Sequence, residues 1–585
     1  MRMGIVMMAT LMLALGCAPA REKASSYAVG PTAAGLVAEY IERYFALYPT
    51  RAVEAGRHDF DGELEVLSAA QLTEWIAFNR DTLERIDALV ATGEPGFDDR
   101  LDLELIERQA RLALFDLETL ERPRTDPLFW TRSIGNATVF LLVRDDAPLE
   151  QRLAGAAARA RRLPELAGEA EKALTGSAAR VAPEIAQIAA RQVRAAAQFY
   201  GEGFAHAADA QEESLREELA GAGSEAQKAL SELADFLEEL AQVATGTVRL
   251  GGDYAERFRL ATGESSPVEE VLARAQAALD SKRREVAAFG REVWADLMGE
   301  ETPPAAPEEL LRRLFARIGD DHASTVDEFV ADYETLLLAA VDFVRRHDVV
   351  TLPEPLTVHT SRSPSFFVGQ SVGGVYPGGP YSPVDAKTLF FLPTPPDGST
   401  AEQQESFFRD FNHHFNVMIT PHEMVPGHYL QLKLAARHPH KVRALFGDGV
   451  YIEGWGTFCE RLMLDLGWGG PADRLAHLKK QLENIARTIV DIRVHTEDMN
   501  RQQVLDFVQG EAFQEAQFAS NMWTRAITSA PQLTTYYLGY SQVSGLFDDV
   551  REVEGEHFVL KRFMDRMMEL GPVPVARYRE LILRE

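Results

Sequence analysis

A glutamate flanked by two histidines lies in the stretch TPHEMVPGHYLQ, which runs from residue 420 to residue 431. The order follows the pattern H-E-x-x-H, in which two histidines one helical turn apart bind zinc and the glutamate serves as a general base. Here His428 comes six residues after His422 instead of four, behind the pair Pro426-Gly427. The stretch predicts a zinc site only if the chain brings the two histidines back together.

A regular helix cannot do this. Residues six apart point about 120° away from each other and lie about 9 Å apart along the axis, whereas zinc requires each ring nitrogen at about 2.0–2.1 Å. Pro426 has no N–H to offer the carbonyl group of His422, and Gly427 tolerates unusual dihedral angles. We therefore predict a helix with a bulge of two residues that returns His428 to the face of His422.

The same residues allow a purely structural interpretation. Thr420, Pro421 and Glu423 also fit the start of a helix, with Thr420 as the N-cap, Pro421 at the first helical position and Glu423 reaching back. A third ligand would favour the metal. Glu453, 25 residues beyond His428, is the candidate; its alternative role is that of a partly buried acid paired with an arginine.

Two segments carry a resemblance to a known family. HEMVPGHYLQ and EGWGTFCERL resemble the signature segments of the bacterial family called domain of unknown function 885, whose members look like zinc-dependent peptidases. YFALYPTRAVEAGRHDFDGELEVLS, VDIRVHT and APQLTTYYLG resemble further blocks of that family. The resemblance implies a mainly α, large, multi-helix, two-lobed peptidase-like fold with a deep cleft and a small β-sheet near the metal site.

The resemblance to this family, and more distantly to thimet-oligopeptidase-like enzymes of the glutamate-type zincins, also implies roles for individual residues. His422, His428 and Glu453 become ligands of Zn²⁺, and Glu423 becomes the general base that takes a proton from a zinc-activated water. Glu460, seven residues after Glu453 and on the same helical face, is expected to orient a ligand. The implied function is that of a zinc metallopeptidase that hydrolyses short peptides.

Stabilisation of the oxyanion requires a further donor. The later blocks and their surroundings offer His495 and Tyr536 as catalytic candidates, with Arg525 and Tyr540 as candidates for substrate binding. The alternative for Tyr536 and Tyr540 is a packed helical stripe, because the two residues are four apart.

Other reactive residues have simpler explanations. Ser371 lies in GQSVG, which matches the nucleophile elbow G-x-S-x-G, but GVYPGGPYSP follows it and cannot form the helix that this motif needs. His413 and His414 are expected to be packed or solvent-facing, and Cys459 is expected to be a buried, unreactive thiol.

A second class of function remains open: an exported peptide-binding or scaffold lipoprotein with a structural zinc. Structural zinc sites fill all four positions with protein ligands, often cysteines, whereas catalytic sites keep one position open. The sequence contains only two cysteines, so it offers no cysteine cluster for a structural zinc. An unpaired Glu423 beside three ligands would favour catalysis.

The N-terminus predicts export. Arg2 precedes a 13-residue apolar run that ends just before Cys17, too short for a transmembrane helix. ALGC resembles a lipobox, so residues 1–17 are interpreted as a lipoprotein signal with Cys17 as the lipidated residue and 18–32 as a linker. This places the protein in the bacterial cell envelope, facing the periplasm or on the outer membrane; the alternative is an ordinary cleaved signal.

Two further regions follow from composition. Residues 33–345 are rich in Ala, Leu, Glu and Arg at helical spacing, which predicts an N-terminal helical region. Residues 346–585 are predicted to be the catalytic region, where a segment rich in Val, Thr, aromatic residues, Gly and Pro should hold the few strands. The best strand candidate is TLFFL, residues 388–392.

The charge limits the partners. The 585 residues carry a formal net charge of -29, which would repel nucleic acid and anionic lipid. We expect no nucleic acid partner, and contact with a membrane only through the N-terminal lipid anchor.

Overall fold

The computed structural model describes residues 32–93, 95–208, 213–362, 374–395 and 398–583. Within these residues the protein is mainly α-helical with one small sheet, which confirms the predicted class. Cys17, the predicted signal and all but the last residue of the predicted linker lie outside the described residues, as does Ser371.

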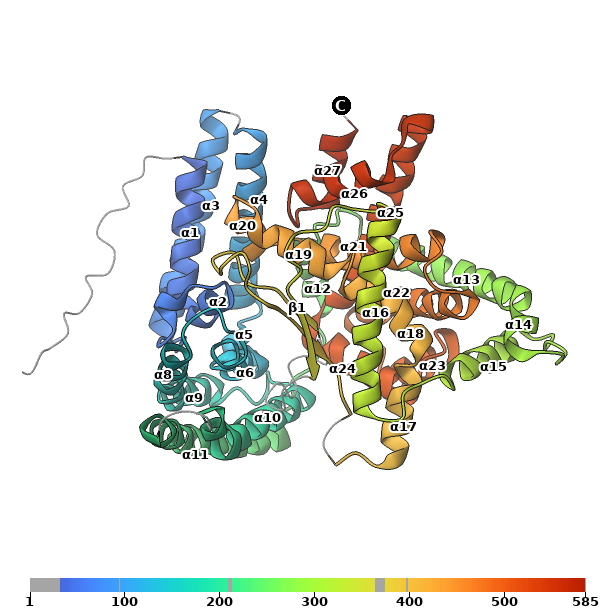
Figure 1. The fold of residues 1–585 in the computed structure, drawn as a ribbon. Helices are drawn as coiled ribbons and strands as arrows, with labels where there is room; N and C mark the ends of the chain where they lie inside the picture. The colour runs from blue at the N-terminus through green and yellow to red at the C-terminus, as the bar shows by residue number, and fades with distance from the viewer. Residues whose placement is uncertain (1–31, 94, 209–212, 363–373, 396–397, 584–585) are drawn as a thin grey trace, which may run out of the picture.

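The N-terminal helices form the blue-to-green group on the left of Figure 1. Their bounds are α1 (Ala33–Leu47), α2 (Pro49–Glu54), α3 (Ala69–Thr92), α4 (Phe97–Leu114), α5 (Arg122–Thr125), α6 (Leu128–Asn136), α7 (Val139–Val143), α8 (Leu149–Ala160), α9 (Leu163–Leu174), α10 (Pro183–Gln198) and α11 (Glu213–Val243). Apolar residues at helical spacing explain them: α10 begins with Pro183 at its first position and buries one alanine-rich face.

Five helices follow within the predicted N-terminal region: α12 (Tyr254–Thr262), α13 (Val268–Glu292), α14 (Trp294–Met298), α15 (Pro307–Gly319) and α16 (Val326–Arg346). Most of them pack with the C-terminal half, and α12 also contacts α4. The core that contains Val271 and Leu314 also contains Leu482 and Ile489, and α16 packs against a later helix. The helices therefore begin to pack with the C-terminal half near residue 250, about a hundred residues before the amino-acid composition changes.

The sheet has three strands, β1 (Val358–Arg362), β2 (Gly374–Tyr376) and β3 (Thr388–Leu392), in the order β1-β3-β2. β3 is TLFFL, so the strand prediction is confirmed. It runs parallel to β1, with Val358 opposite Thr388, and antiparallel to β2. The buried side chains of Phe390 and Leu392 contact one cluster with Met418 and Met424, which fastens the sheet to the histidine-bearing segment.

The remaining helices surround this segment (Figure 1). They are α17 (Ala401–Asp410), α18 (His413–Glu423), α19 (His428–Arg437), α20 (Lys441–Leu445), α21 (Gly449–Asp465), α22 (Pro471–Thr496), α23 (Arg501–Glu511), α24 (Ala516–Ser529), α25 (Thr535–Glu554), α26 (Leu560–Glu569) and α27 (Val575–Ile582). α22 is the central one, because all but five of its 26 residues are buried.

Two of these helices touch backbone to backbone. Gly454 of α21 faces Gly539 of α25, and a Cβ atom added to Gly539 would overlap the carbonyl oxygen of Val450 and the backbone of Gly454. α21 carries Glu453 and α25 carries Tyr536. The glycine contact therefore sets the spacing between two helices that bear predicted site residues.

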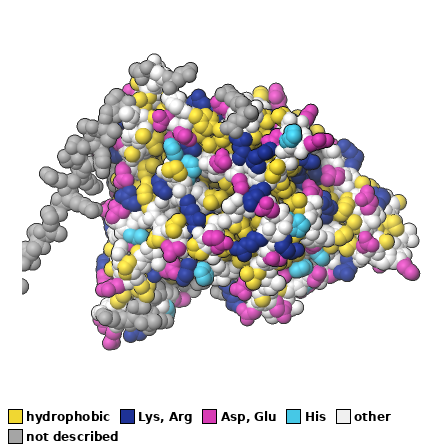
Figure 2. All heavy atoms as spheres, turned by 45° about the horizontal axis from the view of Figure 1, so that its top comes forward, with side chains coloured by type: hydrophobic (Ala, Val, Ile, Leu, Met, Phe, Trp, Pro, Cys, Tyr) yellow, Lys and Arg dark blue, Asp and Glu magenta, His cyan; other side chains and the backbone are white. Residues whose placement is uncertain are grey.

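The described residues contain no helix that is long and apolar enough to cross a membrane. On the face in Figure 2, acidic and basic side chains are interspersed with hydrophobic ones.

Replacement of the contact glycine tests this packing. Gly539→Ala should lower the thermal unfolding midpoint, because overpacking costs about 1–3 kcal/mol. Gly545→Ala in the same helix is the matched control: an added Cβ there meets no atom within 4 Å, so this variant should be neutral or stabilised by about 0.5–1 kcal/mol. Thermal unfolding would be followed by circular dichroism. Equal unfolding midpoints for the two variants would contradict the close contact.

Candidate metal centre

The two histidines come from two helices instead of one bulged helix, which corrects the predicted geometry. α18 ends at Glu423 and α19 begins at His428, so the chain turns within four residues. A Cβ atom on Gly427 would overlap the carbonyl oxygens of Pro421 and His422, so glycine is required at this close return. The indole N–H of Trp455 donates to the carbonyl of Pro426 at 2.9 Å and holds the turn from outside.

The helix-start interpretation of Thr420 and Pro421 is wrong. α18 begins eight residues earlier, where the side chain of Asn412 accepts from the N–H of Phe415, and Pro421 lies inside the helix. A proline leaves the carbonyl four residues before it without a donor. That carbonyl belongs to Val417, and the indole N–H of Trp468 donates to it at 2.8 Å, so the interruption is compensated.

His422, His428 and Glu453 converge on one point. The Nε2 atoms of both histidines lie 3.6 Å from Oε2 of Glu453, and the three ligand atoms all lie within 4.8 Å of one another. Both histidines are buried, and the carboxylate is about one-fifth exposed. The structure thus contains a buried group that could hold a metal ion.

The spacing and chemistry of this group fit zinc. Tetrahedral ligands at about 2.0–2.2 Å from a zinc ion lie roughly 3.3–3.6 Å apart, which matches the two histidine-to-glutamate distances. Two imidazoles and one carboxylate are a ligand set of catalytic zinc sites, which keep a fourth position open. Among the described residues no other group of three such side chains meets the same distance limit.

Glu460 lies behind this group, as its helical spacing predicts. Nδ1 of His422 donates to Oε1 of Glu460 at 2.7 Å, so Nε2 is the nitrogen left for a metal. The other oxygen of Glu460 accepts from Nδ1 of His477 at 3.0 Å. His477 was not predicted, because nothing in its local pattern links it to Glu460, which lies 17 residues earlier in another helix.

A glycine makes room for the first ligand. A Cβ atom on Gly456 would lie 2.8 Å from the ring of His422, and Gly456 shares one helical face with Glu453 and Glu460. The segment EGWG of α21 thus provides a ligand at Glu453, space at Gly456 and the anchor of the preceding turn at Trp455.

The charges of the metal-free group compensate one another. Burial alone would raise the pKa of Glu453, but hydrogen bonds to His422 and His428 hold that pKa well below its usual range. Burial alone would lower the pKa of His422, but Glu453 and Glu460 raise it to about 10. Glu460 has a pKa of about 2, because its hydrogen bonds to His422 and His477 outweigh burial. A metal ion would replace the proton of His422 between two ionised carboxylates.

Glu423 differs from these carboxylates. It is half-buried at the end of α18, next to His422, and no described residue forms a hydrogen bond or ion pair with it.

Tyr536 and Arg525 lie together, and the charge of Glu453 acts on Arg525. The tyrosine oxygen accepts from Nη2 of Arg525 at 3.1 Å and from Nε2 of Gln532 at 3.3 Å, so its own O–H remains available to donate. Burial alone would lower the pKa of Arg525, but Tyr536, Glu453 and Glu483 outweigh it, so the pKa lies above its usual value. Arg487 of α22 covers the ring of Tyr536 at 4.4 Å.

Gln532 and Arg487 are therefore residues that the sequence analysis missed. Gln532 also accepts from Arg525 at 2.6 Å, which makes it the link between that arginine and Tyr536. Tyr540 is placed differently: its half-buried ring packs against the core, with the guanidinium group of Arg461 5.8 Å away.

His495 does not face the metal group, so its position does not support the predicted catalytic role. Its Nδ1 accepts from the N–H of Leu250 at 3.2 Å and its Nε2 donates to the carbonyl of Ala526 at 3.0 Å. It lies 18 residues after His477 along α22, about 27 Å away. Both ring nitrogens are occupied by the backbone, so His495 fastens α22 to its neighbours.

The remaining candidates have structural roles, in agreement with expectation. Nδ1 of His413 contacts Asp332 at 3.0 Å, and Nδ1 of His414 contacts Asp473 at 2.7 Å. Cys459 is fully buried, and burial raises the pKa of its thiol.

Comparison with known proteins identifies relatives without a known activity. The model of the family described as "bacterial protein of unknown function (DUF885)" matches residues 49–582. A "putative lipoprotein of unknown function" from Shewanella oneidensis is similar in structure, with a TM-score of 0.77 and 25% identity over 94% of this chain and 100% of that one. A "putative lipoprotein" from Colwellia psychrerythraea has a TM-score of 0.75 at 15% identity over 94% and 98%. No curated protein matches the sequence.

The carboxylate behind His422 offers a test of metal binding. Glu460→Gln should weaken zinc binding by about 10- to 100-fold, because the imidazole loses the charged partner that orients it. Competition with a zinc chelator would measure this. Asp465→Asn, five residues further along α21 and paired with Arg474 on the surface, should leave the affinity unchanged. Equal affinity of the two variants would exclude an orienting role of Glu460.

His495 generates a pH-dependent prediction. Burial lowers the pKa of the His495 imidazole to about 4 in the folded protein. In the unfolded chain this pKa is near 6.5, so the unfolded chain binds a proton at His495 more tightly. Protonation then favours unfolding, and about 3 kcal/mol of stability is lost as the pH falls from 6.5 to 4.

The variant His495→Gln keeps one donor and one acceptor but cannot take up this proton. Its stability should therefore fall less than that of the wild type between pH 7 and pH 5 in urea titrations. Parallel pH profiles would show that His495 does not titrate in this way.

Proposed function

The chain belongs to the family of bacterial proteins of unknown function called DUF885, and for this member we propose a zinc-dependent metallopeptidase that hydrolyses short peptides. His422, His428 and Glu453 would hold the zinc. A zinc ion in such a site lowers the pKa of a bound water toward neutrality and polarises a carbonyl group. The similarity to glutamate-type zincins is also part of this proposal.

One observation carries the proposal: Glu423 adjoins the ligand His422 and has no partner among the described residues. A partly buried carboxylate without a partner costs stability. Its presence beside a ligand therefore favours a functional role. As general base, Glu423 would accept the proton of the attacking water and pass it to the leaving amine. A purely structural zinc would give no reason to keep this carboxylate free.

Tyr536 and Arg525 supply the second half of the site. With two donors already directed at its oxygen, Tyr536 would donate its own O–H to the oxyanion that forms on the peptide carbonyl. Arg525 fixes that oxygen and lies within electrostatic reach of Glu453, where its planar group would also attract a substrate carboxylate.

The substrate class follows from the surroundings. β1 and β2 are the edges of a sheet that packs next to α18, and an edge strand can pair with an extended peptide. A cleft between two helical lobes, as proposed for this fold, would admit short peptides and exclude folded proteins. Export and lipidation at Cys17 accord with the lipoprotein titles of the two structural relatives.

The proposal is tested by metal content and activity together. His428→Ala should lose zinc and activity, because two ligands hold the ion poorly. Glu423→Gln should keep about one zinc per chain but hydrolyse a library of fluorogenic short peptides at least 100-fold more slowly. Glu402→Gln on the exposed face of α17 is the control and should behave as the wild type. Mass spectrometry measures the metal.

Two results would contradict it. Full peptidase activity in Glu423→Gln would remove the general base. A wild type that binds zinc but cleaves no peptide in the library would favour a peptide-binding or scaffold lipoprotein with a structural zinc.

A further inference from the structure

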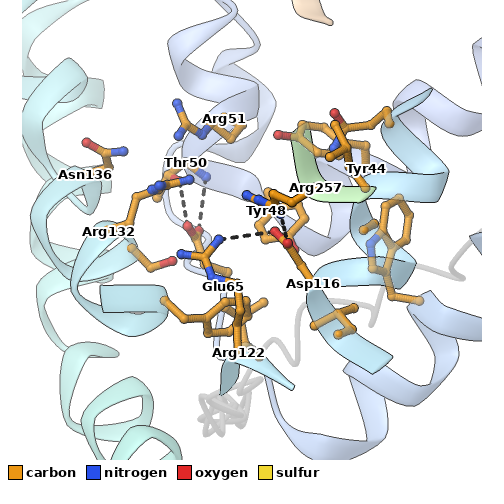
Figure 3. Close-up of a pocket in the computed structure, with 18 residues that line it drawn as sticks. Tyr44, Tyr48, Thr50, Arg51, Glu65, Asp116, Arg122, Arg132, Asn136 and Arg257 are labelled. Carbon is orange, nitrogen blue, oxygen red and sulfur yellow. Dashed lines mark hydrogen bonds and ion pairs between the residues drawn. The ribbon is translucent and has the colours of Figure 1, made fainter. Parts of the chain in front are cut away.

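A cavity of about 230 Å³ lies among the N-terminal helices (Figure 3). Side chains from α1, α2, α3, α4, α5, α6 and α12, and from the turns beside them, line it. None of its lining residues comes from α18, α19 or α21, which carry the metal group. The cavity is thus a separate feature, and its capacity to bind a ligand is independent of the proposed peptidase activity.

Charged side chains line much of this cavity. They are four arginines and two acids: Arg51, Arg122, Arg132, Arg257, Glu65 and Asp116. Figure 3 shows the guanidinium groups gathered around the two carboxylates.

Three of the four arginines have an acidic partner. Asp116 is shared between Arg122, at 3.2 Å, and Arg257. Arg122 also pairs with Asp126 at 2.7 Å, and Arg51 pairs with Glu54. Glu65 is occupied by Thr50, which donates to it from its N–H and its hydroxyl group.

Arg132 is the arginine that remains. No described residue forms a hydrogen bond or ion pair with it, and its side chain is accessible to solvent. Its guanidinium group stays charged at neutral pH. An anion placed here would pair with the arginine of the lining that lacks an acidic partner.

Four of the lining side chains are aromatic. They are Tyr44, Tyr48, Trp75 and Phe129, and the ring of Tyr48 lies 5.1 Å from Tyr44 and 6.4 Å from Trp75. The two tyrosine hydroxyls have no hydrogen-bond partner within the described part of the chain. A ligand could therefore place an apolar or aromatic body against these rings and hydrogen-bond to the hydroxyl groups.

We propose that this cavity binds a small carboxylate with an apolar or aromatic body, its carboxylate held by Arg132 and its body placed against Tyr48 and Trp75. Arginine matches a carboxylate with two parallel hydrogen bonds. The volume is somewhat below that of drug-sized pockets, so it suits one or two amino-acid residues. Such a carboxylate belongs either to a free small molecule or to the C-terminus of a peptide.

The test uses N-acetyl-L-phenylalanine and its neutral amide, titrated into the whole protein in a calorimeter. We expect the acid to bind at least 10-fold more tightly than the amide. Arg132→Gln should reduce binding of the acid at least 10-fold, and Arg132→Lys, which keeps the charge without the planar fork, should reduce it less. Arg124→Gln is the matched control, because Arg124 is exposed on the adjacent α5 and does not line the cavity. Thermal melting would verify that each variant is folded.

Two further arms separate the alternatives. Binding should persist in His428→Ala, which distinguishes the cavity from a carboxylate bound at the metal centre. A heptapeptide ending in phenylalanine would bind as tightly as the small acid if the cavity accepts peptide C-termini, and more weakly if it accepts only free small molecules. Equal binding of acid and amide, or undiminished binding in a folded Arg132→Gln, would overturn the proposal.

Discussion

The metal group depends on one close return of the backbone, where Gly427 lies against the carbonyl groups of Pro421 and His422. A side chain at this position would push α19 away from α18 and separate the two histidine rings. Backbone groups without a partner inside the protein are costly, and both the return and Pro421 leave such groups. Trp455 donates to the carbonyl of Pro426 in the return, and Trp468 donates to the carbonyl of Val417, which Pro421 leaves without a helical donor. The turn is therefore stable only within the folded protein.

The second constraint is electrostatic. Glu460 is fully buried and its two oxygens accept from two different histidines, so a charge that would be costly alone is compensated on both sides. The same bond fixes the orientation of the His422 ring and leaves Nε2 toward Glu453. A single carboxylate thus connects the core of α22 to the face on which a metal would lie.

The sequence predicted what depends on local pattern. Helical spacing identified the class, a β-rich run identified β3, and the seven-residue interval placed Glu460 on the face of Glu453. It could not predict that Pro426 ends the helix instead of bulging it, because the donors that make this possible are distant in sequence. His495 was misjudged for the same reason, since Leu250 and Ala526 occupy its nitrogens and neither is its neighbour in sequence. Gln532 and His477 acquire roles only through contacts between helices.

The cluster around Tyr536 is built by contacts that no single motif contains. Arg525 and Gln532 both donate to the oxygen of Tyr536, and Arg487 covers its ring from α22. The tyrosine oxygen is therefore held by two donors before any ligand arrives. The charge of Glu453 acts on Arg525, which connects this cluster electrostatically to the metal group. Gly454 and Gly539 set the distance between the two parts, because their contact fixes the spacing of α21, which carries Glu453, and α25, which carries Tyr536. Two residues without side chains thus determine how closely the helix of the carboxylate ligand approaches the helix of the tyrosine.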